Sequence, residues 1–246
     1  MNSGKRSNQQ NVDNLELFTE KVITFQPVYD PSESRLSILN QKKIKTSGNE
    51  VLLGVTAAET VCDNATSART TAFDPLDQLV TRVINALRIS DVPEQTILQG
   101  ESIVRELRNK RASETAPPVQ MAETSEGGNQ PKTNKMRSGS FETRIENFTK
   151  LIVLLSTIPA YKPKESELTI ESLKAKLEAL KLVNSAAKTA DSKAEAARLQ
   201  RDIVLYADKT GLVDVAMDSK IYVKSAYGAT SAQYKSISGI LFTKPR

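Results

Sequence analysis

Histidine and tryptophan are missing from this 246-residue sequence, and only one cysteine is present. Without histidine the chain cannot form a serine–histidine triad or a histidine-liganded zinc or di-iron site. A single cysteine excludes a disulfide framework and a CxxC redox motif, and no Gly-x-x-x-x-Gly-Lys phosphate loop occurs. We therefore predict no catalytic, cofactor-binding or metal-binding residues, no cofactor and no enzymatic activity.

Long hydrophobic runs are also missing. The longest apolar run, 151–155, is far shorter than the roughly 18 to 20 residues of a membrane span. Residues 1–14 are polar and lack the apolar core of a secretory signal, so we expect a flexible N-terminal tail there. With Cys62 as the lone cysteine, these features predict a cytoplasmic protein with no membrane partner.

The most informative pattern that is present is an internal repeat. Residues 29–38 (YDPSESRLSI) match residues 161–170 (YKPKESELTI), and each matched pair lies 132 residues apart. Weaker matches flank this segment: Phe18 falls on Phe148, Arg69 on Arg201, and the Leu-Val pair at 79–80 on that at 212–213. This regularity predicts two homologous copies of one structural unit.

The segment between the copies, 112–140, differs in composition from both. It contains Pro117-Pro118, Gly127-Gly128 and many Ser, Thr and Gln, but almost no large apolar residue. Such a segment cannot bury enough apolar surface to offset its ordering entropy. We expect a flexible linker over 112–140, a first helical repeat over 15–111 and a second over 141–246.

Apolar spacing predicts helices throughout the second copy. A first stripe begins behind an expected N-cap at Ser140 and consists of Phe141, Ile145, Phe148, Ile152 and Leu155. Residues 164–210 contain neither Pro nor Gly, which indicates one helix of about 40 residues or, with a break near 184–185, two shorter antiparallel helices. A third helix is expected between Gly211 and Gly228, followed by a short helix at 231–237.

The first copy repeats this plan. We expect a helix closed by Pro27, a long helix from 31 toward 73 that Gly48 and Gly54 make less regular, and a further helix over about 93–108. Between the last two, Asp74 is expected to cap a helix whose first residue is Pro75. The predicted fold is all-α, with two tandem homologous helical-bundle units and long central helices.

These segments resemble a group of internally duplicated helical proteins of Bacteroidota. The resemblance rests on the repeated Tyr-x-Pro-x-Glu-Ser-x-Leu motif, on residues 64–69 and 81–87, and above all on residues 205–214, 222–228 and 233–235. It covers nearly the whole chain except the tail and linker, and it implies a duplicated helical fold. It implies no activity and supplies no catalytic residues. At Ala232, where the group's pattern has Pro, the chain departs from it, which weakens the helix start there.

Three pairs of carboxylates stand one helical turn apart: Asp214 and Asp218, Glu16 and Glu20, and Glu142 and Glu146. Such pairs could hold a hard divalent ion. However, helical carboxylate metal sites use paired Glu-x-x-His or repeated Glu-x-x-Glu motifs, which are absent here. We therefore favour a solvated helix face for each pair.

Three other features have structural interpretations. Cys62 is expected to be a small buried hydrophobic residue. Tyr29 and Tyr161 precede the two matching prolines of the repeat and are expected to cover the turn between the first and the long helix of each copy. Glu33 and Glu165 are expected to stabilise the start of each long helix through its dipole.

The net charge of +5 would suit a polyanionic partner. Basic residues gather in two groups: Arg105, Arg108, Lys110 and Arg111, and Lys42, Lys43 and Lys45. Aromatic residues that could stack on single-stranded bases are not interleaved with them. We therefore predict a structural or protein-interaction protein with a protein partner or self-association, and keep nucleic-acid binding through basic helical faces as the alternative.

Small residues mark the middle of the long helix of the second copy: Ala187, Ala190, Ala194 and Ala197. They permit close approach of another helix, and the long helix of the first copy is the nearest candidate. We predict that the two copies pack through their long helices, within one chain or between two.

Overall fold

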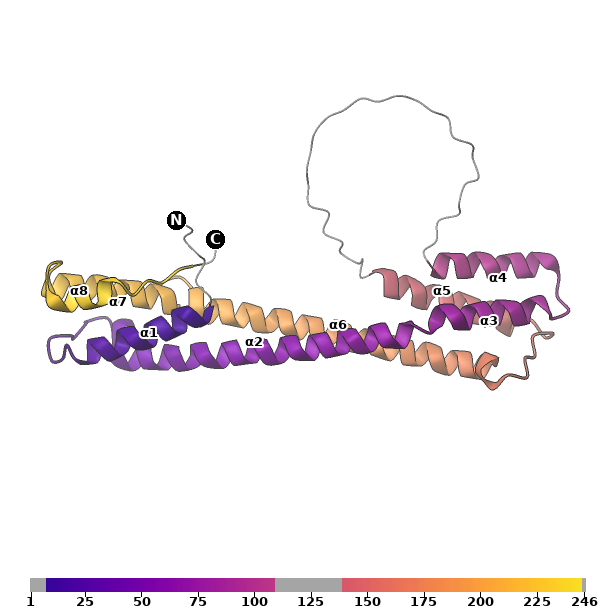
Figure 1. Cartoon of the computed structure of the whole chain (residues 1–246), viewed down its shortest axis with the longest axis horizontal. Coiled ribbons are helices and arrows are strands. Elements are labelled where there is room, and N and C mark those ends of the chain that lie inside the picture. Colours follow the sequence, from indigo (N-terminus) through magenta and orange to yellow (C-terminus); the bar gives the residue numbers. More distant parts are fainter. Residues whose placement is uncertain (1–7, 109–138, 245–246) are drawn as a thin grey trace, which may run out of the picture. The chain divides into compact units, whose positions relative to one another are not determined.

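The computed structural model describes residues 8–108 and 139–244 (Figure 1). In chain order they form α1 (Asn8–Ile23), the 3-10 helix η1 (Ser34–Leu36), α2 (Ile38–Phe73), α3 (Leu76–Arg88), α4 (Glu94–Leu107), α5 (Gly139–Ser156), the 3-10 helix η2 (Ser166–Leu168), α6 (Ile170–Tyr206), α7 (Leu212–Tyr227) and α8 (Ala232–Ser238). Since these two ranges contain helices and no strand, the predicted all-α class is confirmed. None of these helices is long and apolar enough to cross a membrane.

Three predicted helix starts are wrong. The first helix begins at Asn8, inside the expected flexible tail, because Asn11 and Val12 are buried and extend its inward face. Pro75 is the N-cap of α3, and no cap bond from a side chain forms there, so Asp74 is not the cap. Helix α5 already begins at Gly139, which places Ser140 inside the helix. The rest of the expected linker, 112–138, lies outside the described residues.

The two long helices are continuous. Helix α2 has 36 residues and α6 has 37, so α6 has no break near 184–185 and the glycines do not interrupt α2. At Gly48 a Cβ atom would lie 3.0 Å from Cγ2 of Val12, so glycine allows α1 to approach closely. Gly228, with a φ of 88°, ends α7 as predicted.

The described residues divide into two compact units. Unit 1 contains residues 8–64 and 189–244, and unit 2 contains 65–108 and 139–188. Both long helices therefore contribute to each unit. Consequently, each unit draws on both sequence repeats, and the compact units are a different division of the chain from the repeats expected over 15–111 and 141–246.

The core of unit 1 lies among α1, α7, α8 and the adjoining parts of α2 and α6. Helix α1 buries a stripe with spacings of three and four residues, formed by Val12, Leu15, Phe18 and Val22. It packs in one apolar cluster with residues from the other end of the sequence, including Leu205, Leu212, Ala216, Val223 and Ile237. Burial of this apolar surface is the main stabilising contribution to the unit.

The core of unit 2 lies among α3, α4, α5 and the adjoining parts of α2 and α6 (Figure 1). Helix α3 contributes Leu76, Val80, Val83 and Leu87, all fully buried. Residues of the second repeat complete the cluster, among them Phe148, Leu151, Leu155, Leu173 and Leu180.

In unit 1, α2 and α6 lie side by side. An ion pair joins Glu59 to Arg198 at 2.9 Å, and the Cys62 sulfur lies 4.0 Å from Oδ1 of Asp191. Ala190 and Ala194 are buried in the same stretch of α6, while the packing of the two copies through this alanine face stays a prediction. Inward positions on α2 recur every seven residues at Gln41, Gly48, Val55 and Cys62, the spacing of a coiled coil.

Candidate functional site

Corner 1, which we define as residues 24–37 of unit 1, is the turn between α1 and α2. The Tyr29 ring is buried there, and its hydroxyl donates to the carbonyl oxygen of Leu36 at 2.7 Å. Pro27 and Pro31 lack a backbone N–H and fix φ, which keeps this segment out of a helix. The tyrosine therefore closes the turn on itself, as its position in the repeat predicted.

A buried hydrogen-bond network supports corner 1. The Gln41 amide donates to the Tyr29 hydroxyl at 2.8 Å, to the Leu36 carbonyl at 2.9 Å and to the Ser219 hydroxyl at 3.2 Å. Thr19 donates to the Gln41 side-chain carbonyl at 3.1 Å. Gln41 and Ser219 are completely buried, so the burial of either polar side chain would cost free energy if these hydrogen bonds were not made. Burial raises the pKa of Tyr29, although the bonds with Ser219 and Gln41 oppose that shift.

An ion pair lies at the edge of this network. Arg35, in η1, donates to Asp218 of α7 at 2.7 Å and to the Lys209 carbonyl at 3.1 Å. The hydrogen bond with Asp218 raises the pKa of the Arg35 guanidinium above its ordinary value. Glu33 contacts Arg35 at 2.5 Å and stands at the N-cap of η1. Its predicted role at the start of the long helix is wrong, because η1 separates it from α2; the same holds for Glu165 and η2.

Corner 2, residues 157–169 of unit 2, has the same backbone closure. The Tyr161 hydroxyl donates to the Leu168 carbonyl at 3.0 Å. Burial, reinforced by the nearby charge of Glu165, raises the pKa of Tyr161 to about 12. The residue 132 positions after Gln41 is the buried Leu173, which has no amide to donate to this tyrosine.

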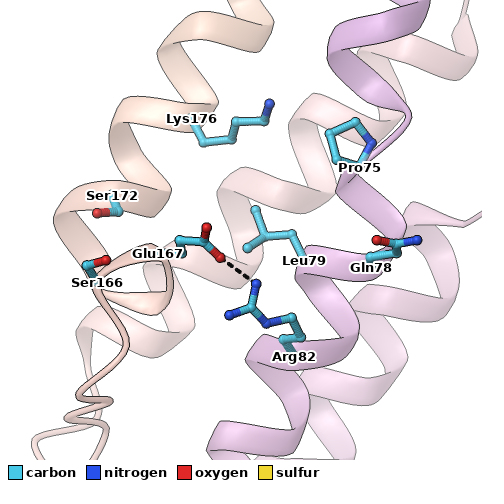
Figure 2. A pocket seen from close by; sticks show the side chains of 8 residues that line it. All are labelled: Pro75, Gln78, Leu79, Arg82, Ser166, Glu167, Ser172 and Lys176. Atoms are coloured by element: carbon cyan, nitrogen blue, oxygen red, sulfur yellow. Dashed lines mark hydrogen bonds and ion pairs between the residues drawn. The ribbon is translucent and has the colours of Figure 1, made fainter.

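A cleft of about 470 Å³ opens beside corner 2 (Figure 2). Arg82 of α3 forms an ion pair with Glu167 of η2, and Lys176 extends from α6 toward Pro75. The other residues that line the cleft are Gln78, Leu79, Ser166 and Ser172. Within this lining, Glu167 neutralises the charge of Arg82.

The ion pairs of the two corners occupy matching positions with opposite charge. Arg35 and Glu167 are the second residues of η1 and η2, and their partners Asp218 and Arg82 are each the seventh residue of α7 and α3. The sequence alone did not reveal this match, because aligning 79–80 with 212–213 set Arg82 against Val215. Counting from the helix starts corrects that alignment.

Five of the six paired carboxylates found in the sequence bind basic groups; they are Asp214, Asp218, Glu16, Glu142 and Glu146. Asp214 accepts from the Lys209 amide at 2.9 Å and from Lys244 at 2.8 Å. Burial alone would raise the pKa of Asp214, but these bonds lower it. Lysines also neutralise Glu16, Glu142 and Glu146. Across residues 8–108 and 139–244, no three His, Cys, Asp or Glu residues are grouped as metal ligands.

The remaining sequence candidates are dispersed. Cys62 is half-buried, so the expected full burial is wrong. Arg105 and Arg108 line a cleft of about 310 Å³ between α3 and α4, together with Arg88 and Glu101. Lys45 pairs with Glu16 at 2.6 Å, while Lys42 and Lys43 are exposed. Lys110 and Arg111 lie outside the described residues.

No protein-family model matches the sequence, and comparisons with curated proteins and with solved structures found no match.

Proposed function

We propose that this is a non-enzymatic helical protein, built from two homologous copies, that acts by binding another protein. The observation that carries this proposal is an apolar pair on α6: Leu199 is 64% exposed and Ile203, one turn later, is 59% exposed. Met217 and Ile221 form a similar exposed pair on α7. When a partner covers neighbouring apolar side chains on a helix face, their removal from water stabilises the complex.

The proposed duplication is supported by structure within each half of the chain. Both halves have the order helix, 3-10 helix, long helix, helix. Both tyrosines donate to a leucine carbonyl seven residues later. A cytoplasmic location is part of the proposal and rests on the single cysteine.

The double substitution L199E/I203E tests partner binding. We expect proteins that co-purify with the native chain from its own cells to be lost, because two charges would enter the contact. The matched control is S192E/Q200E, which adds the same two negative charges at exposed positions of the same helix. Equal recovery of co-purifying proteins with both variants, each melting like the unsubstituted protein, would contradict the proposal.

Nucleic-acid binding through basic helical faces is the second candidate. It is favoured by the α3–α4 cleft, where three arginines face one glutamate. If the arginines contact phosphates, affinity for a duplex should fall steeply between low and moderate salt, and R105E should reduce the salt dependence. Salt-independent or undetectable binding would remove this candidate.

A further inference from the structure

The compact units and the sequence repeats divide the chain differently, which makes each unit a composite. We name residues 8–108 half A and residues 139–244 half B. Unit 1 combines the first helix and corner of half A with α7 and α8 of half B; unit 2 combines the first helix and corner of half B with α3 and α4 of half A. The complementarity of these halves rests on the proposed duplication but not on the proposed partner.

In unit 1 the contacts between the halves are numerous and specific. The Tyr227 hydroxyl donates to the Phe25 carbonyl at 2.6 Å, and the Asn11 amide donates to the Thr243 carbonyl at 2.9 Å. The Tyr29 ring meets Tyr222 edge-on, with centroids 5.2 Å apart. The apolar core of this unit also takes residues from both halves. Half A therefore leaves this core incomplete without half B.

Unit 2 has the same dependence. Phe73 of half A meets Phe141 of half B with centroids 4.9 Å apart, and the Arg69 guanidinium lies 4.3 Å from the Phe141 ring centroid. Arg144 of half B pairs with Asp77 of half A at 2.9 Å. Half B therefore leaves this core incomplete without half A.

The two corners differ in ways that discriminate between possible pairings. In the observed pairing, Arg35 of half A meets Asp218 of half B, and Glu167 of half B meets Arg82 of half A. If half A paired with another half A, the corner arginine would face Arg82. If half B paired with another half B, Glu167 would face Asp218. Like charges in contact destabilise both alternatives.

The buried residues of the two corners also favour pairing of unlike halves over pairing of like halves. Gln41 of half A hydrogen-bonds Ser219 of half B, whereas the equivalent positions in unit 2 are the buried Leu173 and Val83. Pairing of like halves would set Gln41 against Val83 and Leu173 against Ser219. The first arrangement would cost Gln41 one of its three acceptors, and the second would leave the buried Ser219 hydroxyl without the amide that donates to it.

We infer that halves A and B are complementary, that each is the binding partner of the other, and that the corner residues select pairing of unlike halves over pairing of like halves. The chain is then an exchanged dimer of two homologous halves held in one polypeptide. Its stability resides in contact between the halves rather than within either one.

Cleavage of the full chain tests this inference. A protease recognition sequence inserted after residue 126, outside the described residues, allows the folded protein to be cut between the halves. We expect the halves to co-elute in size-exclusion chromatography as a 1:1 complex with unchanged helical circular dichroism. Separation at micromolar concentration into two folded fragments would overturn the inference, whatever the outcome of the partner-binding experiment.

Charge reversal tests the selectivity. In the cleaved protein, R35E should weaken the affinity between the halves by about five-fold, and R35E/D218R should restore it. The matched control is K181E, because Lys181 pairs with Glu178 inside half B. Equal losses for R35E and K181E, or no rescue by the double variant, would overturn the selective role of the corners.

A cross-link provides a second measurement that needs no insertion. In the uncleaved chain, D191C places a thiol beside Cys62, and a short bis-maleimide, to which each thiol adds to form a thioether, should join α2 to α6 within one chain. After limited proteolysis the halves should then stay linked under denaturing conditions. The control K193C, on an exposed part of α6, should not link. Linkage in neither variant, or in both alike, would contradict the pairing.

Discussion

Corners 1 and 2 share one backbone solution but differ in their interior chemistry. In each, a buried tyrosine donates to a leucine carbonyl seven residues later. Around Tyr29 the supporting contacts are polar and come from Gln41 and Ser219, whereas unit 2 has the apolar Leu173 and Val83 at the equivalent positions. The tyrosine bond therefore defines the turn, while the surrounding pairs can be polar or apolar if both members change together.

We expect the largest loss of stability when only one member of the apolar pair Leu173 and Val83 is substituted. L173Q would place an amide in the core of unit 2 without the serine that Gln41 meets, and would remove a fully buried leucine. We expect a loss of about 3 to 5 kcal/mol in the free energy of unfolding, measured with urea. L173M is the control and should cost less than about 1.5 kcal/mol. Equal costs would show that apolar matching in corner 2 is unimportant.

The reverse change in corner 1 should have an intermediate effect. Q41L removes the donor to Tyr29 and Ser219 and leaves the buried serine poorly satisfied. We expect a loss of about 1 to 3 kcal/mol, with partial recovery in Q41L/S219V, which reproduces the pair of corner 2. Additive effects in this double-mutant cycle would contradict the matched-pair interpretation.

The contribution of Tyr161 to stability should depend on pH. The pKa of Tyr161 is raised to about 12 in the folded protein, against about 10 in an unfolded chain. Folding therefore favours the neutral hydroxyl, and the resulting stabilisation is complete below about pH 10. It is lost as pH rises from about 10 toward 12, at a rate of about 1.4 kcal/mol per pH unit.

The variant Y161F tests this pH dependence. At pH 7 it should lose about 1 kcal/mol with the bond to Leu168. Between about pH 9 and pH 11 its stability should fall less steeply than that of the unsubstituted protein, in urea unfolding at each pH. Parallel pH profiles would show that Tyr161 does not titrate with unfolding.

The sequence predicted the helices well because their apolar spacing is regular. The stripe over 141–155 and the turn residues Pro27, Gly211 and Gly228 located most elements. Helix starts were less predictable, since the buried Asn11 is hydrogen-bonded by groups far away in sequence, the backbone of Thr243 and the Tyr206 hydroxyl. The same reason hid the candidate site: Arg35 and Asp218 meet through tertiary contact, and no local pattern pairs them.

The variant with the smallest expected effect on stability tests most directly whether the opposite charges of corners 1 and 2 select the partner. R82E/E167R reverses the ion pair of corner 2 and restores it with opposite polarity. Because the pair is exposed, the free energy of unfolding should change by less than about 1 kcal/mol. Pairing of like halves, however, would no longer bring like charges together, since residue 35 of one half A would meet a carboxylate and residue 167 of one half B would meet Asp218.

We therefore expect a larger fraction of dimeric chains for R82E/E167R, measured by light scattering over a range of protein concentrations. E178K/K181E is the control, because it reverses an ion pair inside half B and should leave the mass distribution unchanged. A double variant that assembles like the unsubstituted protein would mean that the corner charges do not set the choice of partner. Selectivity would then depend on the buried Gln41–Ser219 and Leu173–Val83 pairs alone.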